Sequence, residues 1–532
     1  MTTYDFIIIG GGSAGCVLAE RLSASGKFQV CLLEAGPSDK HWSIHLPLGI
    51  IELMKNKTLN WQFNSEQELS QNQRSIFNPR GKVLGGSSSI NAMLYVRGQK
   101  QDYDHWAELG NDQWSFDKVL PYFKSTEHQE RGEDQFHGIN GELNVADSRS
   151  KITIGDNFIT AAHHAGYPLN DDFNGNNQEG VGYYQVTQKN GKRCSAAAAF
   201  LTPNLHRPNL TVITDALVQN LIIENKQATG VCFKHQGKSQ QIFANNEVLL
   251  SAGAFNSPQI LMLSGIGDKD ELTQHNINVV HDLIGVGKNL QDHVDVMVVT
   301  HHKRSDVLAY RPKSSWWFIK QIQKYFTQKR GVLTSTVAEA GGFIKSSPEL
   351  ERPDLQLHFI PAAMDDHGRN NKMLLNYGVS LHTCILRPKS RGEVTLHSNN
   401  PSCHPKIHLN MLAHADDQKE IVNAVKIARD ILAQSPLAED NGQEILPGKN
   451  IQSDEDILTF AKNKANTIYH PVGTCKMGND EMAVVDQHLK VHGIKNLRVV
   501  DASIMPTLIS GNTNAPTIMI AAKIADEILA MY

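Results

Sequence analysis

The chain has 532 residues and a formal net charge of −4 at pH 7. Because a single hydrophobic core stops growing at roughly 250–300 residues, this length predicts two closely joined domains. No block of basic residues indicates nucleic acid as a partner. The seven cysteines are scattered without C-x-x-C spacing. They argue against a disulfide framework or a structural zinc site, and reduced thiols fit a cytoplasmic location.

No targeting or membrane-spanning segment is predicted. The first residues run straight into an apolar segment without a basic region or cleavage site, so no secretory signal is expected. No uninterrupted run of about 18 apolar residues occurs, so no transmembrane helix is expected. Over the first 300 residues, strand-like and helix-like segments alternate, which predicts an α/β sheet.

The N-terminal segment has the pattern of a dinucleotide-binding unit. The apolar stretch Tyr4–Gly10 predicts a buried strand, and Gly10, Gly12 and Gly15 follow with G-x-G-x-x-G spacing. These glycines allow a tight turn, close approach of a pyrophosphate, and close packing of helix on strand. The N-terminus of the following helix offers free N–H groups and a positive dipole end to the phosphates.

An acidic residue completes this fingerprint. A second predicted strand, Gln29–Leu33, ends at Glu34, which stands 19 residues after Gly15. A carboxylate at this position accepts hydrogen bonds from the ribose hydroxyls of a bound dinucleotide. Since strand, glycines, helix, second strand and acid occur in this order, the pattern indicates a nucleotide site rather than an empty glycine-rich turn.

The same segment also resembles a motif of serine hydrolases. Residues 11–15 also match G-x-S-x-G, the nucleophile elbow of α/β hydrolases. That fold needs an oxyanion N–H from a loop after an earlier strand, and this motif follows the first strand of the chain. The hydrolase is therefore excluded, and Ser13 is expected to contact phosphate.

Four segments spread along the chain resemble signatures of the glucose–methanol–choline (GMC) oxidoreductases. They are RGKVLGGSSSINAMLYVRG at 80–98, GAFNSPQILMLSGIG at 253–267, IYHPVGTCKMG at 468–478, and RVVDASIMPTLISGNTNAPTIMIAAKIAD at 498–526. The resemblance implies a Rossmann-type FAD-binding domain interleaved with a substrate domain on an antiparallel sheet. We expect residues 1–297 to be mainly FAD domain, 298–464 mainly substrate domain, and 465–532 a return to the FAD domain.

Within this family the chain looks most like medium-chain alcohol dehydrogenases of bacterial alkane oxidation, and next like choline dehydrogenases. The implied reaction is oxidation of a primary alcohol to an aldehyde, by hydride transfer to flavin N5. Electrons would pass to a quinone or another acceptor that is not oxygen. Oxidation of choline is the alternative, and a flavin-bearing electron carrier without a small substrate is a distant one.

The fingerprint and the resemblance together assign the cofactor site. The residues expected to bind FAD are Gly10, Gly12, Ser13, Gly15, Glu34, Ala35, Arg80, Gly85, Gly86, Ser87, Asn91, Ala92, Val218, Asp501, Ala502, Asn514, Pro516 and Thr517. In some family members a histidine just before the residue matching Asn91 bonds covalently to the flavin. Ile90 stands there in this chain, so non-covalent FAD is expected.

The resemblance also indicates a catalytic pair. His470 matches the active-site histidine of the family, and Asn514 matches a second position held by histidine or asparagine. Neutral histidine suits the role of base toward the alcohol hydroxyl. The asparagine amide could donate a hydrogen bond to the developing alkoxide. No metal site is expected.

Residues 307–338 hold six basic residues and no acid, with aromatic and aliphatic residues between them. This pattern is typical of a basic amphipathic helix on an anionic membrane surface. A lid over the substrate site explains it equally well, and both remain open. For choline as substrate, Glu339 could supply a counter-charge, and Trp316 and Trp317 an aromatic cage.

Overall fold

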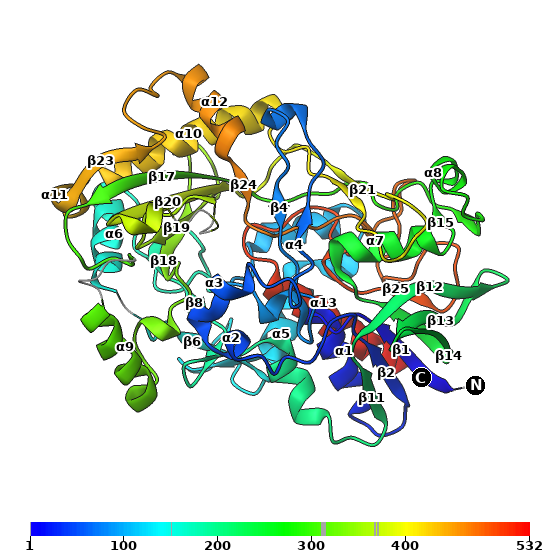
Figure 1. Cartoon of the computed structure of the whole chain (residues 1–532). Coiled ribbons are helices and arrows are strands. Elements are labelled where there is room, and N and C mark those ends of the chain that lie inside the picture. The colour runs from blue at the N-terminus through cyan, green and yellow to red at the C-terminus, as the bar shows by residue number, and fades with distance from the viewer. Residues whose placement is uncertain (1, 151, 310–314, 367–368, 370–371) are drawn as a thin grey trace.

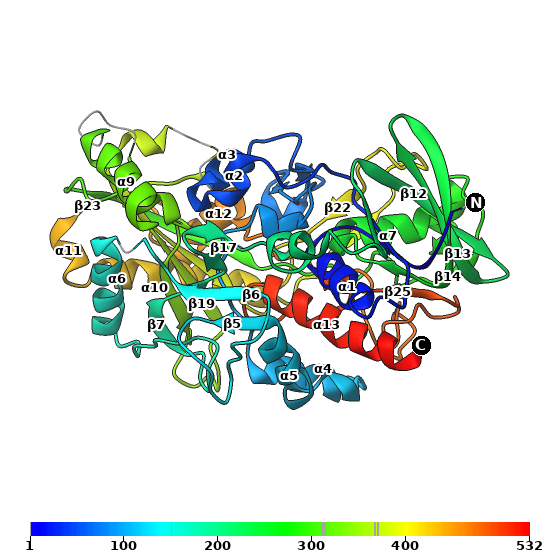
Figure 2. The ribbon, with the colours of Figure 1, turned by 90° about the horizontal axis from the view of Figure 1, so that it is seen from below.

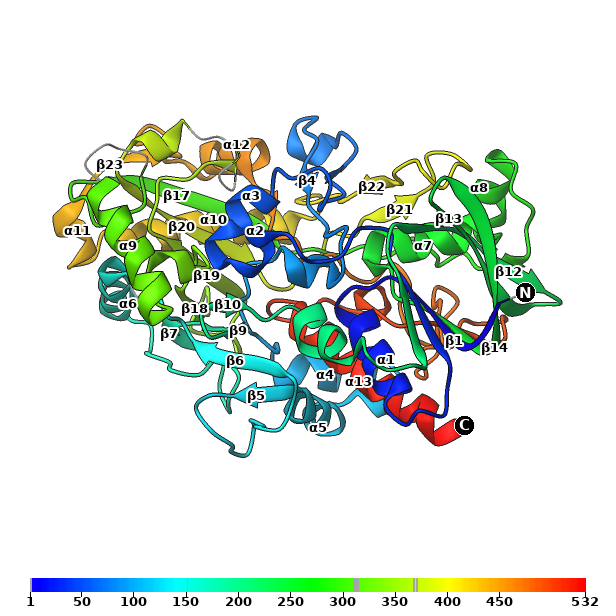
Figure 3. The same cartoon turned by 60° about the horizontal axis from the view of Figure 1, so that its bottom comes forward.

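The computed structural model describes residues 2–150, 152–309, 315–366, 369 and 372–532, and for 315–318 it describes the backbone only. Two seven-stranded sheets dominate this part of the chain. They lie in opposite halves of the molecule, with helices between and around them (Figures 1 and 3). The expected α/β fold with a separate antiparallel sheet is confirmed.

The first sheet is largely parallel and contains the predicted nucleotide unit. Its strand order is β11-β2-β1-β14-β13-β12, and β25 pairs with β14. The strands are β1 (Thr3–Ile9), β2 (Val30–Leu33), β11 (Leu210–Ile213), β12 (Ala216–Glu224), β13 (Gln227–His235), β14 (Lys238–Leu250) and β25 (Leu497–Val499). Strands β1, β2, β11, β14 and β25 run parallel, and β12–β13–β14 form an antiparallel meander. The buried, β-branched run of β1 explains its central place.

Two helices from opposite ends of the chain pack together on this sheet. Helix α1 (Ser13–Ser23) follows the glycine turn, and α13 (Asn514–Met531) is the last helix. Both contribute buried residues to one large core with the strands. Pro516 lies in the first turn of α13, where a missing N–H costs no helical hydrogen bond. Figure 2 shows α1 and α13 side by side.

The second sheet is antiparallel throughout. Its order is β23-β17-β20-β19-β18-β7, and β24 pairs with β17. The strands are β7 (Gly180–Tyr183), β17 (Val294–His302), β18 (Ala340–Ile344), β19 (Leu355–Ile360), β20 (Gly378–Ile385), β23 (Asn441–Leu446) and β24 (Asn466–Thr467). Helices α6 (Thr153–His164), α10 (Ala415–Leu432) and α12 (Asp454–Lys464) bury apolar faces in its core.

The two sheets exchange segments along the sequence. Strand β7 joins the second sheet before β11–β14 complete most of the first, and β25 returns to the first sheet after β24. The boundaries 297/298 and 464/465 remain predictions.

Further helices and short strands lie around the two sheets. They are α2 (Trp42–His45), α3 (Ile50–Leu53), α4 (Lys100–Glu108), α5 (Phe116–Thr126), α7 (Gly253–Leu263), α8 (Lys269–Gln274), α9 (Ser315–Gln328), α11 (Leu437–Asp440), and short strands β3 (Phe63–Asn64), β4 (Phe77–Asn78), β5 (Glu127–Gln129), β6 (Leu143–Asp147), β8 (Gln185–Val186), β9 (Gln188–Lys189), β10 (Lys192–Arg193), β15 (Ile266–Gly267), β16 (His281–Asp282), β21 (Glu393–Thr395) and β22 (Lys406–His408).

Candidate active site

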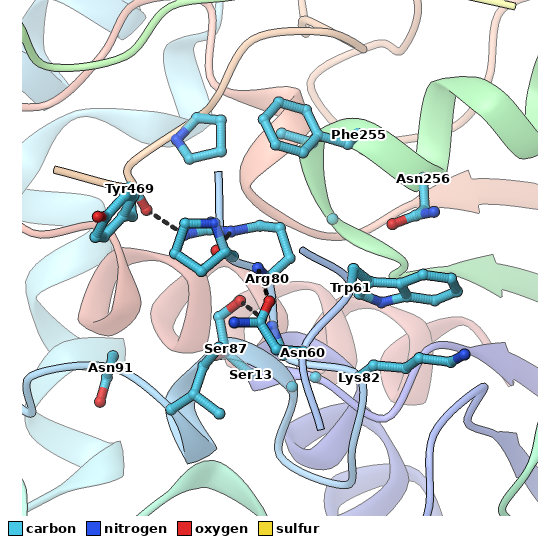
Figure 4. Close-up of a pocket in the computed structure, with 18 of the residues that line it drawn as sticks. Ser13, Asn60, Trp61, Arg80, Lys82, Ser87, Asn91, Phe255, Asn256 and Tyr469 are labelled. Carbon is cyan, nitrogen blue, oxygen red and sulfur yellow. Dashed lines mark hydrogen bonds between the residues drawn. The ribbon is translucent and has the colours of Figure 1, made fainter. Parts of the chain in front are cut away.

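One large cavity joins the nucleotide turn to the predicted catalytic histidine. Its volume is about 690 Å³. Most of the predicted site residues line it: Gly10, Gly12, Ser13, Glu34, Ala35, Arg80, Gly86, Ser87, Asn91, Ala92, Val218, His470, Asp501, Ala502, Asn514 and Thr517. Figure 4 shows part of this lining, including Ser13, Ser87, Arg80 and Tyr469.

Three predicted residues do not line the cavity but shape its wall. A Cβ atom on Gly15 would lie 1.9 Å from the carbonyl oxygen of Gly10, so only glycine lets helix α1 approach the turn. Gly85 has a φ of +86°, and its N–H donates to Gly11 O at 2.7 Å. Pro516 is buried in the first turn of α13. These residues set the backbone around a ligand.

Two glycine-rich loops meet back to back at the nucleotide end of the cavity. A Cβ atom on Gly86 would lie 2.7 Å from Gly12 Cα. No side chain caps the N-terminus of α1, whose first residue Ser13 lines the cavity. The first N–H groups of α1 are therefore free to bind an anion, and the absence of Cβ atoms on the glycines leaves room beside them. Both features suit the pyrophosphate of a dinucleotide.

Glu34 holds the turn to the end of β2. Its carboxylate accepts hydrogen bonds from the N–H groups of Gly11 and Gly36, each at 2.8 Å. Burial raises the pKa of the Glu34 carboxyl to about 7. Because Glu34 also lines the cavity, the acid expected for ribose recognition lies where the sequence pattern requires it.

The side chain of Asp501 forms hydrogen bonds that hold two segments of the fold together. Its Oδ2 accepts from Gly253 N at 2.8 Å and from Ser257 Oγ at 2.6 Å, at the start of α7. Its Oδ1 accepts from Ser503 N at 2.8 Å. Three of the roughly four acceptor sites of this carboxylate are therefore used to join α7 to the segment after β25.

His470 sits on a loop that is held on several sides. The backbone N–H of His470 donates to Asp292 Oδ1 at 2.9 Å, and the hydroxyl of Thr467 donates to the other carboxylate oxygen of Asp292. Arg80 donates from Nη2 to the carbonyl oxygen of Tyr469 at 2.5 Å (Figure 4). Burial lowers the pKa of Arg80 to about 10, so the guanidinium stays charged at neutral pH. Arg80, predicted as a cofactor residue, thus anchors the loop that carries His470 and lines the cavity as well.

The imidazole of His470 contacts one polar side chain on each nitrogen. Nε2 lies 3.1 Å from Nδ2 of Asn512. Nδ1 lies 2.9 Å from Nδ1 of His293. Burial is the main reason that the pKa of His470 falls well below its ordinary value, and nearby His293 and Arg80 add to it. The ring is therefore neutral at physiological pH, as a proton acceptor must be.

The structure pairs His470 with Asn512 and not with Asn514, the residue chosen from the sequence. The Oδ1 atom of Asn514 accepts a hydrogen bond from Ser13 Oγ at 2.8 Å, across the start of α1. Sequence reasoning missed Asn512 and His293. The repeated asparagine in Asn512-Thr513-Asn514 was the available signal, but spacing alone does not tell which amide turns toward the histidine.

The end of the cavity beyond His470 has mostly apolar walls. Val337, Ala338, Ile360 and Met364 line it and belong to one buried apolar cluster. The polar groups Thr336, His358 and His382 interrupt this surface. This compartment suits a ligand with a small polar head and an apolar body.

Glu339 does not lie where a choline substrate would need it. Its side chain is buried, and it lines a separate small pocket with Tyr183 and Phe359. Burial raises the pKa of its carboxyl, and it does not line the main cavity. The side chains of Trp316 and Trp317, proposed for a cage, lie outside the described residues. The suggested counter-charge at Glu339 is therefore wrong.

Among the described residues, no group of three or more histidine, cysteine, aspartate or glutamate side chains could hold a metal ion. In the same part of the chain, no helix is both long and apolar enough to cross a membrane.

Comparison with known proteins identifies the family. The N-terminal model of the GMC oxidoreductases matches residues 4–295, and the C-terminal model matches residues 388–521. The chain belongs to the GMC oxidoreductase family. With its intact nucleotide fingerprint, it is a flavoprotein oxidoreductase whose cofactor is FAD.

Individual relatives cover nearly the whole chain. An alcohol dehydrogenase [acceptor] of Pseudomonas putida is 48% identical over 99% of this chain and 96% of its own length. A mitochondrial choline dehydrogenase of Mus musculus is 42% identical over 99% of this chain and 89% of its own length. Among solved structures, pyridoxine 4-oxidase from Mesorbium loti superposes with a TM-score of 0.90 at 29% identity, covering 99% of both chains.

Proposed function

We propose that the protein oxidises a primary alcohol with an apolar, medium-length chain to the aldehyde. The observation that carries the proposal is the neutral, buried imidazole of His470, whose Nε2 lies beside the amide of Asn512 at the apolar end of the cavity. The likeness to the alcohol dehydrogenase of Pseudomonas putida supports the substrate class.

His470 and Asn512 would have different roles at the alcohol oxygen. Nε2 of His470 accepts the hydroxyl proton, and the Nδ2 group of Asn512 donates a hydrogen bond to the oxygen as negative charge develops. A positioned base is worth about 10²–10⁴-fold in rate. When bound, FAD supplies the hydride acceptor. The apolar walls exclude water from the reacting carbon and hold the chain of the substrate.

FAD would be held by the two glycine loops and the residues around them. Glycine backbone at Gly12 and Gly86 and the start of α1 would take the pyrophosphate, Glu34 the ribose, and Val218 the adenine. Ile90 lines the cavity and is buried at the position where some relatives attach the flavin covalently. A hydrocarbon side chain forms no such bond, so FAD is bound non-covalently. Denaturation should release all the yellow colour into the supernatant, and flavin that precipitates with the chain would contradict this.

Choline is the competing substrate, because dehydrogenases for it are 42% identical to this chain. A quaternary ammonium needs a carboxylate or an aromatic cage. The acids that line the described cavity are Glu34 and Asp501, both at the nucleotide end. Behind the wall, Asp295 is buried and accepts a hydrogen bond from Nδ1 of His382 at 2.7 Å. Trp61, Phe255 and Tyr469 do line the cavity, so the feature that favours a neutral alcohol is that neither acid lining the described cavity lies at the His470 end.

The deciding experiment measures the anaerobic reduction of the bound flavin, which is monitored as loss of its yellow colour (bleaching). The purified protein is mixed with 1-hexanol, 1-octanol or 1-decanol, and in parallel with choline. We expect fast bleaching by the aliphatic alcohols and slow or absent bleaching by choline. The reverse ranking would establish choline as substrate. Bleaching by neither would favour an electron carrier.

For the electron acceptor we propose a quinone reached at a membrane surface. Helix α9 projects at the edge of the molecule (Figure 1) and carries the exposed side chains of Ile319, Ile322 and Phe326. Lys320, Lys324 and Arg330 are exposed beside them. From α9 the chain runs through the short helix η8 (Val332–Thr334) into Thr336–Ala338, which line the cavity. Contact of α9 with anionic lipid would place the cavity near apolar substrates and quinones.

A further inference from the structure

We propose that His293 is a positioning residue that keeps the proton of neutral His470 on Nδ1 and so leaves Nε2 free to act as the base. This inference rests on the function proposed above, because it concerns the residue assigned there as base. His293 is fully buried and does not line the cavity. It can therefore influence a substrate only through His470.

The direction of the hydrogen bond between His293 and His470 follows from the group that His293 contacts with its other ring nitrogen. Nε2 of His293 lies 3.1 Å from the carbonyl oxygen of Ile509. A carbonyl oxygen only accepts, so Nε2 of His293 carries a proton. Burial lowers the pKa of His293 to about 3, so its ring is neutral and its Nδ1 has no proton. The contact of 2.9 Å between the two Nδ1 atoms is then a hydrogen bond only if His470 donates it.

The amide on the other side of His470 agrees with this assignment. Gln356 donates from Nε2 to Oδ1 of Asn512 at 3.1 Å, which turns the Nδ2 group of Asn512 toward His470. An amide NH₂ group only donates, so Nε2 of His470 must accept at the contact of 3.1 Å. Both neighbours of the ring thus select the same tautomer, with the proton on Nδ1 and the lone pair on Nε2.

The segment that carries His293 also fixes the two active-site loops relative to each other. Gln291 pairs with Val472 through two backbone hydrogen bonds of 3.1 and 2.9 Å, next to the His470 loop. The side chain of Gln291 accepts from Leu508 N at 3.1 Å and donates to Pro506 O at 3.1 Å, on the loop that leads to Asn512. His293 itself joins His470 to this loop through Ile509. A change at His293 therefore acts on the proton position and on the join between the loops.

The tautomer decides whether His470 can work as a base. With its proton on Nε2, the ring would present a donor to the substrate hydroxyl and to the Asn512 amide, and it could not accept the hydroxyl proton. Without His293, nothing among the described contacts of Nδ1 would hold the proton there. In a serine-protease triad, a change that leaves the histidine in the wrong tautomer costs about 10⁴-fold in rate.

The first test reads the tautomer directly in the FAD-bound protein labelled with ¹⁵N in its histidine rings. The signals of His470 are those that vanish in His470→Gln and persist in His293→Gln. We expect a protonated, pyrrole-type Nδ1 and an unprotonated, pyridine-type Nε2 in the wild type. A wild-type Nε2 that carries the proton would overturn the proposal, whether or not any variant folds.

The second test compares two replacements of His293. His293→Leu replaces the imidazole by an apolar side chain of similar size and so removes both hydrogen bonds, whereas the glutamine of His293→Gln can accept from His470 and donate to Ile509. We expect His293→Leu to retain FAD, to lose the Nδ1–H signal pattern, and to bleach with alcohol about 10–10³-fold more slowly. His293→Gln should recover most of the rate and the wild-type tautomer. Equal losses in both variants, or an unchanged tautomer in His293→Leu, would show that His293 only fills space.

The two tests separate this inference from the proposed function. If no alcohol bleaches the wild type, the proposed substrate is wrong, and the ¹⁵N spectra still decide whether His293 sets the tautomer. If alcohols bleach the wild type and His293→Leu behaves like it in rate and spectrum, only the role of His293 is wrong.

Discussion

Nδ2 of Asn512 lies 3.1 Å from Nε2 of His470, while the amide oxygen of Asn514, two residues along, accepts from Ser13 at 2.8 Å. The two asparagines therefore face different parts of the cavity. We therefore assign Asn512 to the substrate oxygen, as proposed above, whereas Asn514 ties the start of α13 to the nucleotide turn. This division can be tested with matched substitutions.

Asn512→Ala should slow flavin reduction by alcohol about 10²–10³-fold, because a donor to the developing alkoxide is lost. Asn514→Ala is the control with the same change in size, and it should chiefly weaken FAD binding, because it removes the contact with Ser13. Stopped-flow bleaching and the dissociation constant for FAD measure the two effects. If Asn514→Ala had the larger effect on bleaching at full FAD occupancy, the pairing argued from the structure would fail.

His470→Ala should keep its yellow colour and lose most of its reaction with alcohols. The imidazole is assigned to the proton and not to holding the cofactor, so the rate should fall about 10²–10⁴-fold with FAD content unchanged. Anaerobic bleaching with 1-octanol measures the rate, and the visible spectrum measures FAD content. A near-normal rate would mean that another group is the base.

The pH dependence should follow from the pKa of His470, which burial holds well below 6.5. A base with a lowered pKa is unprotonated above that pKa and becomes protonated as the pH falls through it. The rate of flavin reduction should therefore be flat from about pH 6.5 upward through neutrality and fall only in more acidic solution. A rate that still climbs with a midpoint at or above pH 6.5 would contradict a neutral buried base.

Charge reversal on α9 and the two residues that follow it should weaken sedimentation with anionic vesicles. Changing Lys320, Lys324, Lys329 and Arg330 to glutamate replaces attraction by repulsion, and salt should weaken the wild-type interaction in the same direction. The matched control reverses Lys226, Lys234, Lys238 and Lys495, which are exposed at the opposite end of the molecule, around β12–β14. Co-sedimentation with phosphatidylglycerol vesicles at low salt is the measurement. Equal loss in both variants would indicate a general charge effect and not a surface on α9.

A buried ionic cluster should make the stability of the fold depend on pH. His137 lies 2.9 Å from Asp172 and 3.1 Å from Glu127, which also pairs with Arg97 at 2.7 Å. Burial lowers the pKa of His137, but the hydrogen bonds to the two carboxylates outweigh it and raise the pKa to about 9. The stabilisation that protonated His137 gives to the folded state is therefore complete below about pH 6.5, and it is lost as the pH rises through about 9.

The matched variant His137→Gln keeps a polar side chain but cannot titrate. Between pH 6.5 and 9.5 the wild type should lose on the order of 1–3 kcal/mol of its unfolding free energy relative to the variant. Tm values of both proteins across this range measure the difference. Parallel Tm curves would show that His137 does not change its protonation in this window.

Much of the nucleotide site could be predicted, because its function depends on backbone geometry that few residues tolerate. Gly10, Gly15 and Glu34 are recognisable by spacing alone, and the structure places them as the fingerprint requires. The antiparallel character of the second sheet is implied by the family resemblance, and the strand-like segments near 387–397 and 406–412 also suggest a separate antiparallel sheet. In the structure these segments form a two-stranded pair of their own, β21 and β22, outside the second sheet. In the second sheet, β17 pairs with β20 although α9, β18 and β19 lie between them in the sequence, so no local pattern shows how its strands pair.

The catalytic pair was harder to predict because it depends on which side chains turn inward on irregular loops. His470 was chosen from one motif, but its partners come from elsewhere: His293 from the segment before β17, and Asn512 from the loop before α13. The choice between Asn512 and Asn514 is settled by a turn of the backbone just before a helix, where no periodicity applies. Spacing in the sequence carries no information about such a turn.

The return of β25 and α13 to the first sheet has a consequence for synthesis on the ribosome. Strand β25 pairs with β14, and α13 covers α1, so the first sheet lacks two of its neighbours until residues 497–532 have emerged. The asparagines at 512 and 514 emerge with them. A nascent chain of about 490 residues would hold the glycine turn and His470 and still have no complete cradle for a flavin. Cofactor capture should therefore be a late event, and a cleavage in the loop between β25 and α13 should release flavin while leaving most of both sheets intact.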